Sequence, residues 1–277
     1  QSYIGEVPSN FTGWVHEPQI LHSPRPQEAC KSGRKRRYPR LARKALSASE
    51  VKNLLIYSRQ FQKQKWRRFK IKDGEKGPVV WEVKHAPFYR KHGPAGLPGP
   101  SHTLIVARNV LNHDEIKYFL SNMTVGSGVS LEWMLWVAFS RWPIERCFEL
   151  AKQNLGMDHF ETRSWRGIHR HLYISQLSLL FLGAFIIASE KKTVEVLYLT
   201  VEQVYQAACA WVAAQSLPPP ARQIIYRRAA RRIVYYQKRN RRARICHTKQ
   251  TLRRLREIGI EVDQLNRVYR IIYDNFA

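Results

Sequence analysis

Residues 140–156 read SRWPIERCFELAKQNLG, and this stretch predicts one helix with two chemically different sides. Arg141, Glu145 and Lys152 follow the spacing R-x3-E-x6-K, which places them within about 40° of one another around a helix. A carboxylate held between two cations can bind a metal ion while the cations hold phosphate. The opposite side of the predicted helix carries mainly apolar side chains: Ile144, Cys147, Phe148, Ala151 and Leu155.

The same spacing also has an ordinary structural explanation. Glu149 lies on the polar side as well, so residues three and four apart form a ladder of charges. Such ladders usually lie on the solvated face of a helix. Spacing alone favours this surface explanation, and the sequence that follows the helix has to decide between the two.

The composition of the chain favours a polyanionic partner. The chain has 277 residues, with 47 Lys and Arg against 21 Asp and Glu, a formal net charge of +26 and a pI near 10.3. Hydrophobic residues make up 44%, which is typical of a globular protein rather than of a disordered one. Nucleic acid is therefore the first candidate partner, and an anionic membrane surface is the second.

The cysteines and the longest apolar run bear on compartment and core. The four cysteines lie far apart without a C-x-x-C pair, which favours reduced cytoplasmic thiols over a zinc ribbon or a disulfide framework. Cys147 and Cys209 lie in apolar helical contexts and are predicted to be buried. Residues 174–188, ISQLSLLFLGAFIIA, fall short of the roughly 18 residues of a membrane span. This run predicts a buried core helix, with a transmembrane helix as the weaker alternative.

The sequence before the predicted helix is rich in β-strand patterns. Residues 1–16 resemble a strand that leads into a loop, and residues 17–49, Pro-rich and then basic, are typical of a linker or an exposed arm. Alternating residues on both sides of Asp73-Gly74 predict a hairpin, and the proline and glycine of residues 86–101 predict a loop. A short helix is expected at 50–57, and strands are expected near 103–110 and 117–123.

The sequence after Gly128 is helical and becomes strongly basic. Residues 222–256 contain 14 Lys and Arg and no Asp or Glu. Uncompensated cations on a helix repel one another, and arginine suits bidentate phosphate contact, so the region predicts nucleic-acid binding. The alternative is a solvated basic tail. The candidates for DNA or phosphate contact here are Arg227, Arg228, Arg231 and Arg232. Helices are expected near 129–155, 165–190, 194–216, 221–239, 241–257 and 261–275.

The predicted helix continues into a long ordered block, RWPIERCFELAKQNLGMDHFETRSWRGIHRH at residues 141–171. This block resembles the C-terminal catalytic region of bacterial insertion-sequence DDE transposases, in the branch with a Tyr-Arg-Glu-Lys signature. The segments YIGEVPSNFTGW at 3–14, VARNV at 106–110 and EIKYFLSN at 115–122 also resemble the family's sequence upstream of its Glu. The resemblance covers most of residues 1–190.

The resemblance implies a fold and a set of site residues. The fold is α+β or α/β, with a partial RNase H-like core, a β-rich insertion and a basic helical C-terminal region. Glu145 matches the family's third carboxylate, a catalytic residue and a ligand of Mg²⁺, of which the intact family enzyme holds two. Arg141 and Lys152 match its phosphate-contacting cations, and Arg163 and Arg166 are further candidates for DNA contact. The family has a tyrosine three residues before the arginine, where this chain has Ala138.

The resemblance also implies an organisation and partners. The expected partners are the DNA of the insertion-sequence ends and of the target, bound by a homodimer, with no membrane involved. The expected place is the bacterial cytoplasm, at the nucleoid. The expected segments are the end of a catalytic-core strand at 1–16, a linker and β-rich insertion at 17–115, the catalytic Glu helix with core helices at 116–192, and the basic region at 193–277.

The two aspartates of the family's catalytic site have no match in this chain. Only Asp73 and Asp114 precede Glu145, and their contexts predict a turn former and a cap. We therefore expect the chain to be the C-terminal part of a transposase that lacks the aspartate pair. One carboxylate cannot hold two Mg²⁺ ions, so the chain alone is predicted to be inactive. The alternative is a non-catalytic DNA-binding remnant of a transposase.

The residues around H-R-H invite a metal-site interpretation that helix geometry excludes. His169 and His171 would point about 200° apart on a helix and cannot share an ion there. Packing or DNA contact is the better interpretation for both. Trp165 is predicted to anchor the core, and Ser164 is predicted to cap the helix that begins there.

Overall fold

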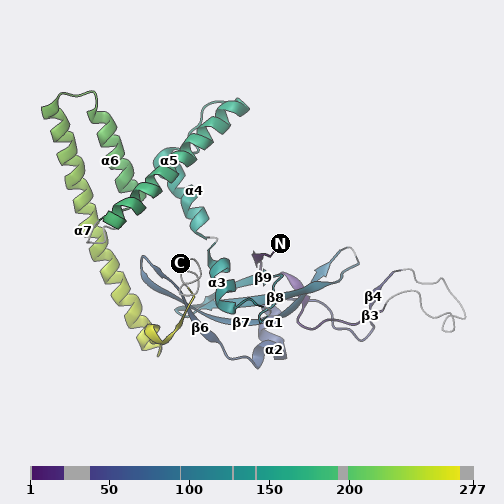
Figure 1. The fold of residues 1–277 in the computed structure, drawn as a ribbon. Helices are drawn as coiled ribbons and strands as arrows, with labels where there is room; N and C mark the ends of the chain where they lie inside the picture. Colours follow the sequence, from purple (N-terminus) through teal and green to yellow (C-terminus); the bar gives the residue numbers. More distant parts are fainter. Residues whose placement is uncertain are drawn as a thin grey trace, which may run out of the picture. The chain divides into compact units, whose positions relative to one another are not determined.

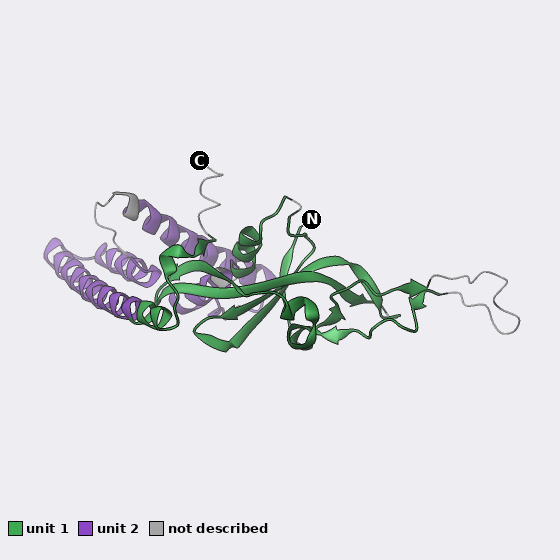
Figure 2. Cartoon of the chain, turned by 90° about the horizontal axis from the view of Figure 1, so that it is seen from below, with its two compact units in different colours: residues 1–139, 250–277 green, residues 140–249 purple. Residues whose placement is uncertain are grey.

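The computed structural model describes residues 2–21, 38–93, 95–126, 128–140, 142–192 and 199–268. The protein is α+β, one of the two classes predicted, with a mostly antiparallel sheet. The chain divides into two compact units, residues 1–139 with 250–277 and residues 140–249 (Figure 2). These limits differ from the predicted segment limits at 16, 115 and 192. The first unit continues to residue 139, and it also includes the end of the chain, which returns to its sheet.

The first unit is built on an eight-stranded sheet (Figure 1). Its strand order is β1-β9-β8-β7-β2-β5, and β6 pairs with β7 and β10. The pair β10–β6 is parallel and the others are antiparallel. The strands are β1 (Ile4–Val7), β2 (Thr12–Trp14), β5 (Ser49–Glu50), β6 (Arg67–Gly74), β7 (Gly77–His92), β8 (Leu97–Asn109), β9 (Asn112–Ser121) and β10 (Asn266–Arg267). A separate small sheet pairs β3 (Ile20–Leu21) with β4 (Arg40–Leu41).

The predicted hairpin at Asp73-Gly74 is confirmed as β6 and β7, whereas the loop predicted at 86–101 is wrong. β7 runs to His92, and β8 begins at Leu97. Proline is tolerated in a strand where its missing N–H faces no partner. Pro87 lies between the stretches of β7 that pair with β6 and with β2, so only β8 is its neighbour. Pro87 therefore does not end β7.

Side chains alternate between the two faces of this sheet, and helices cover both. α3 (Leu131–Phe139) packs on one face through Leu131, Met134 and Leu135. α1 (Val51–Tyr57), at the position predicted for a short helix, and α2 (Arg59–Gln62) cover part of the other face. Further along that second face, Val80 of β7 packs with Leu255, Ile260 and Val262 from the end of the chain.

The second unit is helical. It contains α4 (Trp142–Leu155), α5 (Trp165–Lys192), α6 (Val201–Ala214) and most of α7 (Pro219–Glu257). The helix predicted at 129–155 is two helices, α3 and α4, and the two helices predicted at 221–239 and 241–257 are one. The tail helix predicted at 261–275 is wrong for its described part, which is a 3₁₀ turn at Val262–Gln264 followed by β10. Residues 269–277 lie outside the described residues.

α5 is not the buried core helix that residues 174–188 predict. Leu177, Leu180 and Phe181 are 64%, 68% and 64% exposed, and burial is limited to the side of Ser175 and Leu182. Among the described residues it is the one helix long and apolar enough to cross a bilayer, with 11% of its most apolar window buried. That criterion rests on length and composition alone. The described part of the second unit covers one side of α5, which is why the prediction of burial fails.

Candidate functional site

Two members of the predicted site, Glu145 and Lys152, lie exposed on α4. Glu145 is in the first turn of the helix and Lys152 is in the last. They are nearly two helical turns apart, so both extend from the same side. Arg141, the third member, lies outside the described residues. α4 therefore presents the predicted carboxylate and one predicted cation on its exposed side.

Exposed polar side chains of α4 pair along its surface, as the alternative explanation of the spacing predicts in general, but Glu149 pairs with Arg146 and Gln153. Arg146 Nη1 donates to Glu149 Oε2 at 2.7 Å, and Gln153 Nε2 donates to Glu149 Oε1 at 3.1 Å. The hydrogen bond from Arg146 holds the pKa of Glu149 below its ordinary value. On the apolar side Ala151 is buried, but Ile144 is 59% exposed, so the predicted packed stripe is only partly formed.

Three residues that the sequence predicts to be buried are exposed: Cys147, Cys209 and Trp165. Their apolar character predicted burial. They are exposed because the described residues cover only part of each helix surface. Arg163 and Arg166, predicted to contact DNA, are exposed at the start of α5.

The cap and the histidines at the start of α5 behave as predicted. Ser164 Oγ accepts a hydrogen bond from Gly167 N at 3.1 Å, which caps the helix. The ring of His169 lies against Trp165, with centroids 4.0 Å apart. His171 Nε2 is 2.8 Å from the carbonyl oxygen of Gly156. The two imidazoles have separate partners and packing roles.

The described residues do not fit a pair of magnesium ions. No group of three or more His, Cys, Asp or Glu side chains gathers anywhere in the described part of the chain. Asp73 pairs with Lys70 at 2.8 Å, and Asp114 lies exposed within β9 rather than at a cap. Mg²⁺ requires several oxygen ligands in octahedral geometry, and Glu145 alone does not supply them. No chemical step through a metal follows from these residues.

Eight of the cations of α7 lie on one side of the helix, whereas Arg222, Arg241, Arg244 and Arg254 extend from other sides. We call the following eight side chains, all exposed, the α7 cationic stripe. At 100° per residue they occupy about 140° of arc. The side of the helix that is less exposed carries Ala229, Ile233 and Gln237 instead. The members of the stripe are Arg227, Arg228, Arg231, Arg232, Lys238, Arg239, Arg242 and Lys249.

The α7 cationic stripe is not neutralised by acidic side chains. Within the described part of the chain, no Asp or Glu forms an ion pair with any of its eight members. α7 itself has one acidic residue, Glu257, which accepts from Arg253 Nε at 2.9 Å, beyond the stripe. A concentrated positive charge without internal partners is the usual footprint of a polyanion site.

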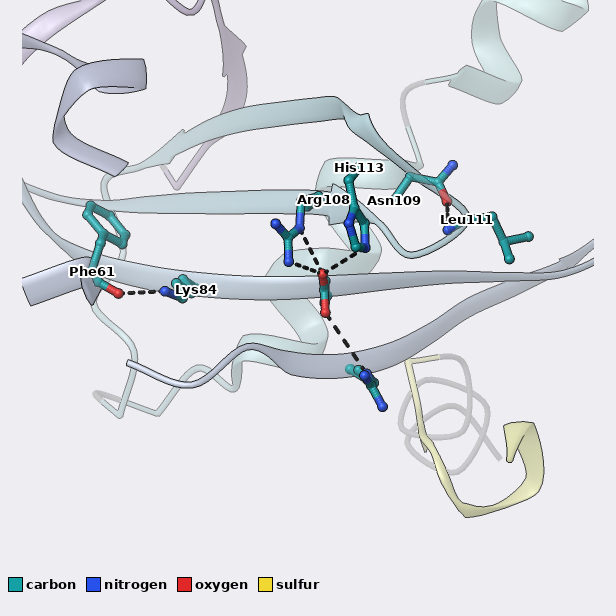
Figure 3. A network of polar contacts seen from close by, with 8 residues as sticks. Phe61, Lys84, Arg108, Asn109, Leu111 and His113 are labelled. Atoms are coloured by element: carbon teal, nitrogen blue, oxygen red, sulfur yellow. Dashed lines mark hydrogen bonds and ion pairs between the residues drawn. The ribbon is translucent and has the colours of Figure 1, made fainter. Parts of the chain in front are cut away.

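A second group of cations, which the sequence reading missed, lies on the sheet around Glu82 of β7 (Figure 3). Glu82 pairs across the strands with Arg68 of β6 and Arg108 of β8, so the three side chains lie in one row on one face. Nε and Nη2 of Arg108 donate to Glu82 Oε1 at 2.8 and 2.5 Å. Nε of Arg68 is 3.9 Å from Glu82 Oε2, and Nε2 of His113 is 3.6 Å from Oε1.

An aromatic ring and a lysine complete this group. Cζ of Arg108 lies 4.3 Å from the centroid of the Trp66 ring, and Nζ of Lys84 lies 4.8 Å from the same centroid. Lys84 Nζ also donates to the carbonyl oxygen of Phe61 at 2.6 Å (Figure 3). Burial lowers the pKa of Lys84, the charge of Arg108 lowers it further, and Glu82 partly opposes this.

A signal for this group is present in the sequence. The run VVWEVKHA at residues 79–86 places Glu82 and Lys84 on one side of an otherwise apolar strand. Charged residues on a buried strand face require partners on neighbouring strands. The partners of Glu82 are Arg68 and Arg108, which only the strand register identifies.

No family model matches the sequence, and no curated protein or solved structure matches the chain.

Proposed function

We propose that this chain is the C-terminal part of a DDE transposase of the insertion-sequence type and that it holds DNA by its backbone phosphates. The observation that carries the DNA binding is the α7 cationic stripe, whose eight exposed cations have no acidic partner among the described residues. Mutual repulsion of these cations is relieved when phosphates neutralise them. A side of a helix that carries eight exposed cations suits contact with a polyanionic chain.

The assignment to a transposase rests on the ordered block at residues 141–171. In this proposal Glu145 is the third carboxylate of an RNase H-like core with Mg²⁺, and Lys152 contacts phosphate. Arg163 and Arg166, exposed near the start of α5, are further phosphate contacts. The proposal includes a homodimer on DNA and a place at the bacterial nucleoid.

A second candidate function is a DNA-binding transposase remnant without catalysis. The observation in its favour is that no acidic cluster forms among the described residues. Both candidates share the α7 cationic stripe and the same expectation for DNA binding. They differ only in whether Glu145 takes part in phosphodiester cleavage.

Binding of a fluorescein-labelled DNA duplex, followed by anisotropy at several salt concentrations, tests the shared part of the proposal. Each phosphate contact contributes about 0.9 to the slope of log affinity against log salt for duplex DNA. We expect a steep slope for the wild-type chain. Replacing Arg227, Arg228, Arg231 and Arg232 together by Gln should reduce that slope by roughly 3 to 4 and weaken binding.

The matched control removes the same charge elsewhere. The fourfold variant of α7 and the control variant each lower the formal net charge by four, from +26 to +22. The control residues are all exposed and none is a member of the α7 cationic stripe, so their replacement by Gln should leave the slope nearly unchanged. Equal losses in the two variants would show that only net charge matters and would overturn the assignment to α7. The control residues are Lys52, Arg59, Lys63 and Lys76.

A further inference from the structure

We infer that the row formed by Arg68, Glu82 and Arg108 on the sheet is a second phosphodiester-binding site for DNA, separate in the sequence from the α7 cationic stripe. Glu82 is the positioning residue of this site, and the two arginines are its binding residues. The inference rests on the proposed DNA-binding function and adds a site that composition alone does not indicate.

The geometry brings the two guanidinium groups together. Arg68 and Arg108 belong to the two strands on either side of β7, and both approach the carboxylate of Glu82 from the same face of the sheet. Each guanidinium has five N–H donors in a fixed plane. Arg108 uses two of them on Glu82 Oε1, which leaves three for other acceptors. Because both groups converge on one small carboxylate, a single phosphate group can be contacted by both.

The local charge is positive. Two guanidinium groups oppose the one carboxylate of Glu82, which leaves one formal positive charge before Lys84 is counted. Two acidic residues of the neighbouring strands have other partners, and Asp114 of β9 lies exposed. Asp73 pairs with Lys70 at 2.8 Å, and Glu115 accepts from Asn109 Nδ2 at 2.6 Å. The row is therefore attractive to an anion.

Stability alone explains Glu82 and Arg108 but not Arg68. Glu82 is 5% exposed and needs a close cationic partner, which the two hydrogen bonds from Arg108 supply. The side chain of Arg68 is 45% exposed, and its nearest contact with Glu82 is 3.9 Å. An exposed pair at that distance contributes little to stability. A second arginine held loosely beside a satisfied carboxylate is suited to an external acceptor.

The surroundings hold the Arg108 guanidinium in one pose. The Trp66 ring covers it at 4.3 Å, and the two hydrogen bonds to Glu82 fix its plane. A guanidinium that is oriented before binding loses less conformational entropy when phosphate arrives. The side chain remains 25% exposed, so part of it stays accessible to solvent.

Two adjacent arginines of β6 provide a closely matched test. Arg67 and Arg68 have side chains 52% and 45% exposed, each pairs with one glutamate, and they point to opposite faces. Arg68→Gln and Arg67→Gln remove the same charge from neighbouring positions. For a labelled DNA duplex we expect Arg68→Gln to weaken binding about tenfold and to reduce the salt slope by about 1, whereas Arg67→Gln leaves both nearly unchanged.

A second variant tests positioning without loss of charge. Arg108→Lys keeps the cation but loses the two hydrogen bonds that the guanidinium donates to Glu82 Oε1, so we expect weaker duplex binding despite an unchanged net charge. Circular dichroism and the urea midpoint identify any variant that is merely unfolded, and Arg68→Gln, being exposed, carries the test if Arg108→Lys is unstable. Binding of the same proteins to phosphatidylglycerol vesicles separates DNA phosphate from lipid phosphate.

The outcomes separate the two proposals. If the wild-type chain binds duplex DNA and Arg68→Gln behaves like Arg67→Gln, the sheet site is wrong while DNA binding through α7 stands. If Arg68→Gln weakens vesicle binding but not duplex binding, the sheet site belongs to a lipid surface and the inference is overturned. If the wild-type chain does not bind DNA at all, the proposed function itself fails.

Discussion

At the scale of single residues, Gly13 shows how closely two strands of the sheet approach. β2 pairs with β7, and Gly13 lies opposite Arg90. A Cβ at Gly13 would overlap the ring of Phe88 and lie 2.5 Å from the carbonyl oxygen of Tyr89. Phe88 is fully buried in the core beneath α1 and α2, so its ring has no room to move. Only glycine fits at this position of the β2–β7 pair.

We expect Gly13→Ala to lower the free energy of unfolding by about 1–3 kcal/mol, because the added methyl group forces the ring or the strand to shift. Gly5→Ala is the matched control, since Gly5 lies in β1 of the same sheet and a Cβ there meets nothing within 4 Å. It should change stability by less than about 0.5 kcal/mol. Urea unfolding followed by circular dichroism compares the two, and equal stabilities would contradict the packing at Phe88.

At the scale of elements, α7 is one continuous helix of 39 residues where the sequence predicted two. The run Arg239-Asn240-Arg241 contains neither glycine nor proline, so no residue there ends the helix. Continuity matters for the proposed function. It keeps one helical phase from Arg227 to Lys249 and so places the eight cations of the stripe on one side.

The α7 cationic stripe should therefore reduce helix stability while it promotes DNA binding. Arg227 and Arg231, and Arg228 and Arg232, are like charges four residues apart. We expect their joint replacement by Gln to leave the urea midpoint unchanged or to raise it, by a few tenths of a kcal/mol for each repulsive pair removed. The same variant is expected to bind DNA more weakly. A clear loss of stability would mean that these arginines serve the fold instead.

At the scale of the whole molecule, the chemistry of cleavage needs more carboxylates than the described residues bring together. We expect the chain to show no magnesium-dependent nicking of supercoiled DNA, although we expect it to bind that DNA. Glu145→Gln should then change nothing in the nicking assay, because one carboxylate does not bind two Mg²⁺ ions. Magnesium-dependent nicking that disappears in Glu145→Gln would show that the chain is catalytic by itself and would remove the remnant as an alternative.

Local patterns in the sequence were sufficient for several features of this protein. They predicted a β-rich part followed by helices, the β6–β7 hairpin, the helix of α4 and the cap at Ser164. They also located the basic region of α7. Each of these depends on residues close together in the chain, through strand alternation, helical spacing or a side chain that caps a nearby N–H.

The tertiary structure alone decided which surfaces are covered and which distant residues meet. It kept Pro87 inside a strand because neighbouring strands leave its missing N–H unopposed, and it left most of α5 exposed. It returned residues 250–268 to the first sheet and set Arg68, Glu82 and Arg108 in one row. Burial and cross-strand register are properties of elements far apart in the chain. No local pattern contains the partner that covers a face or neutralises a buried carboxylate.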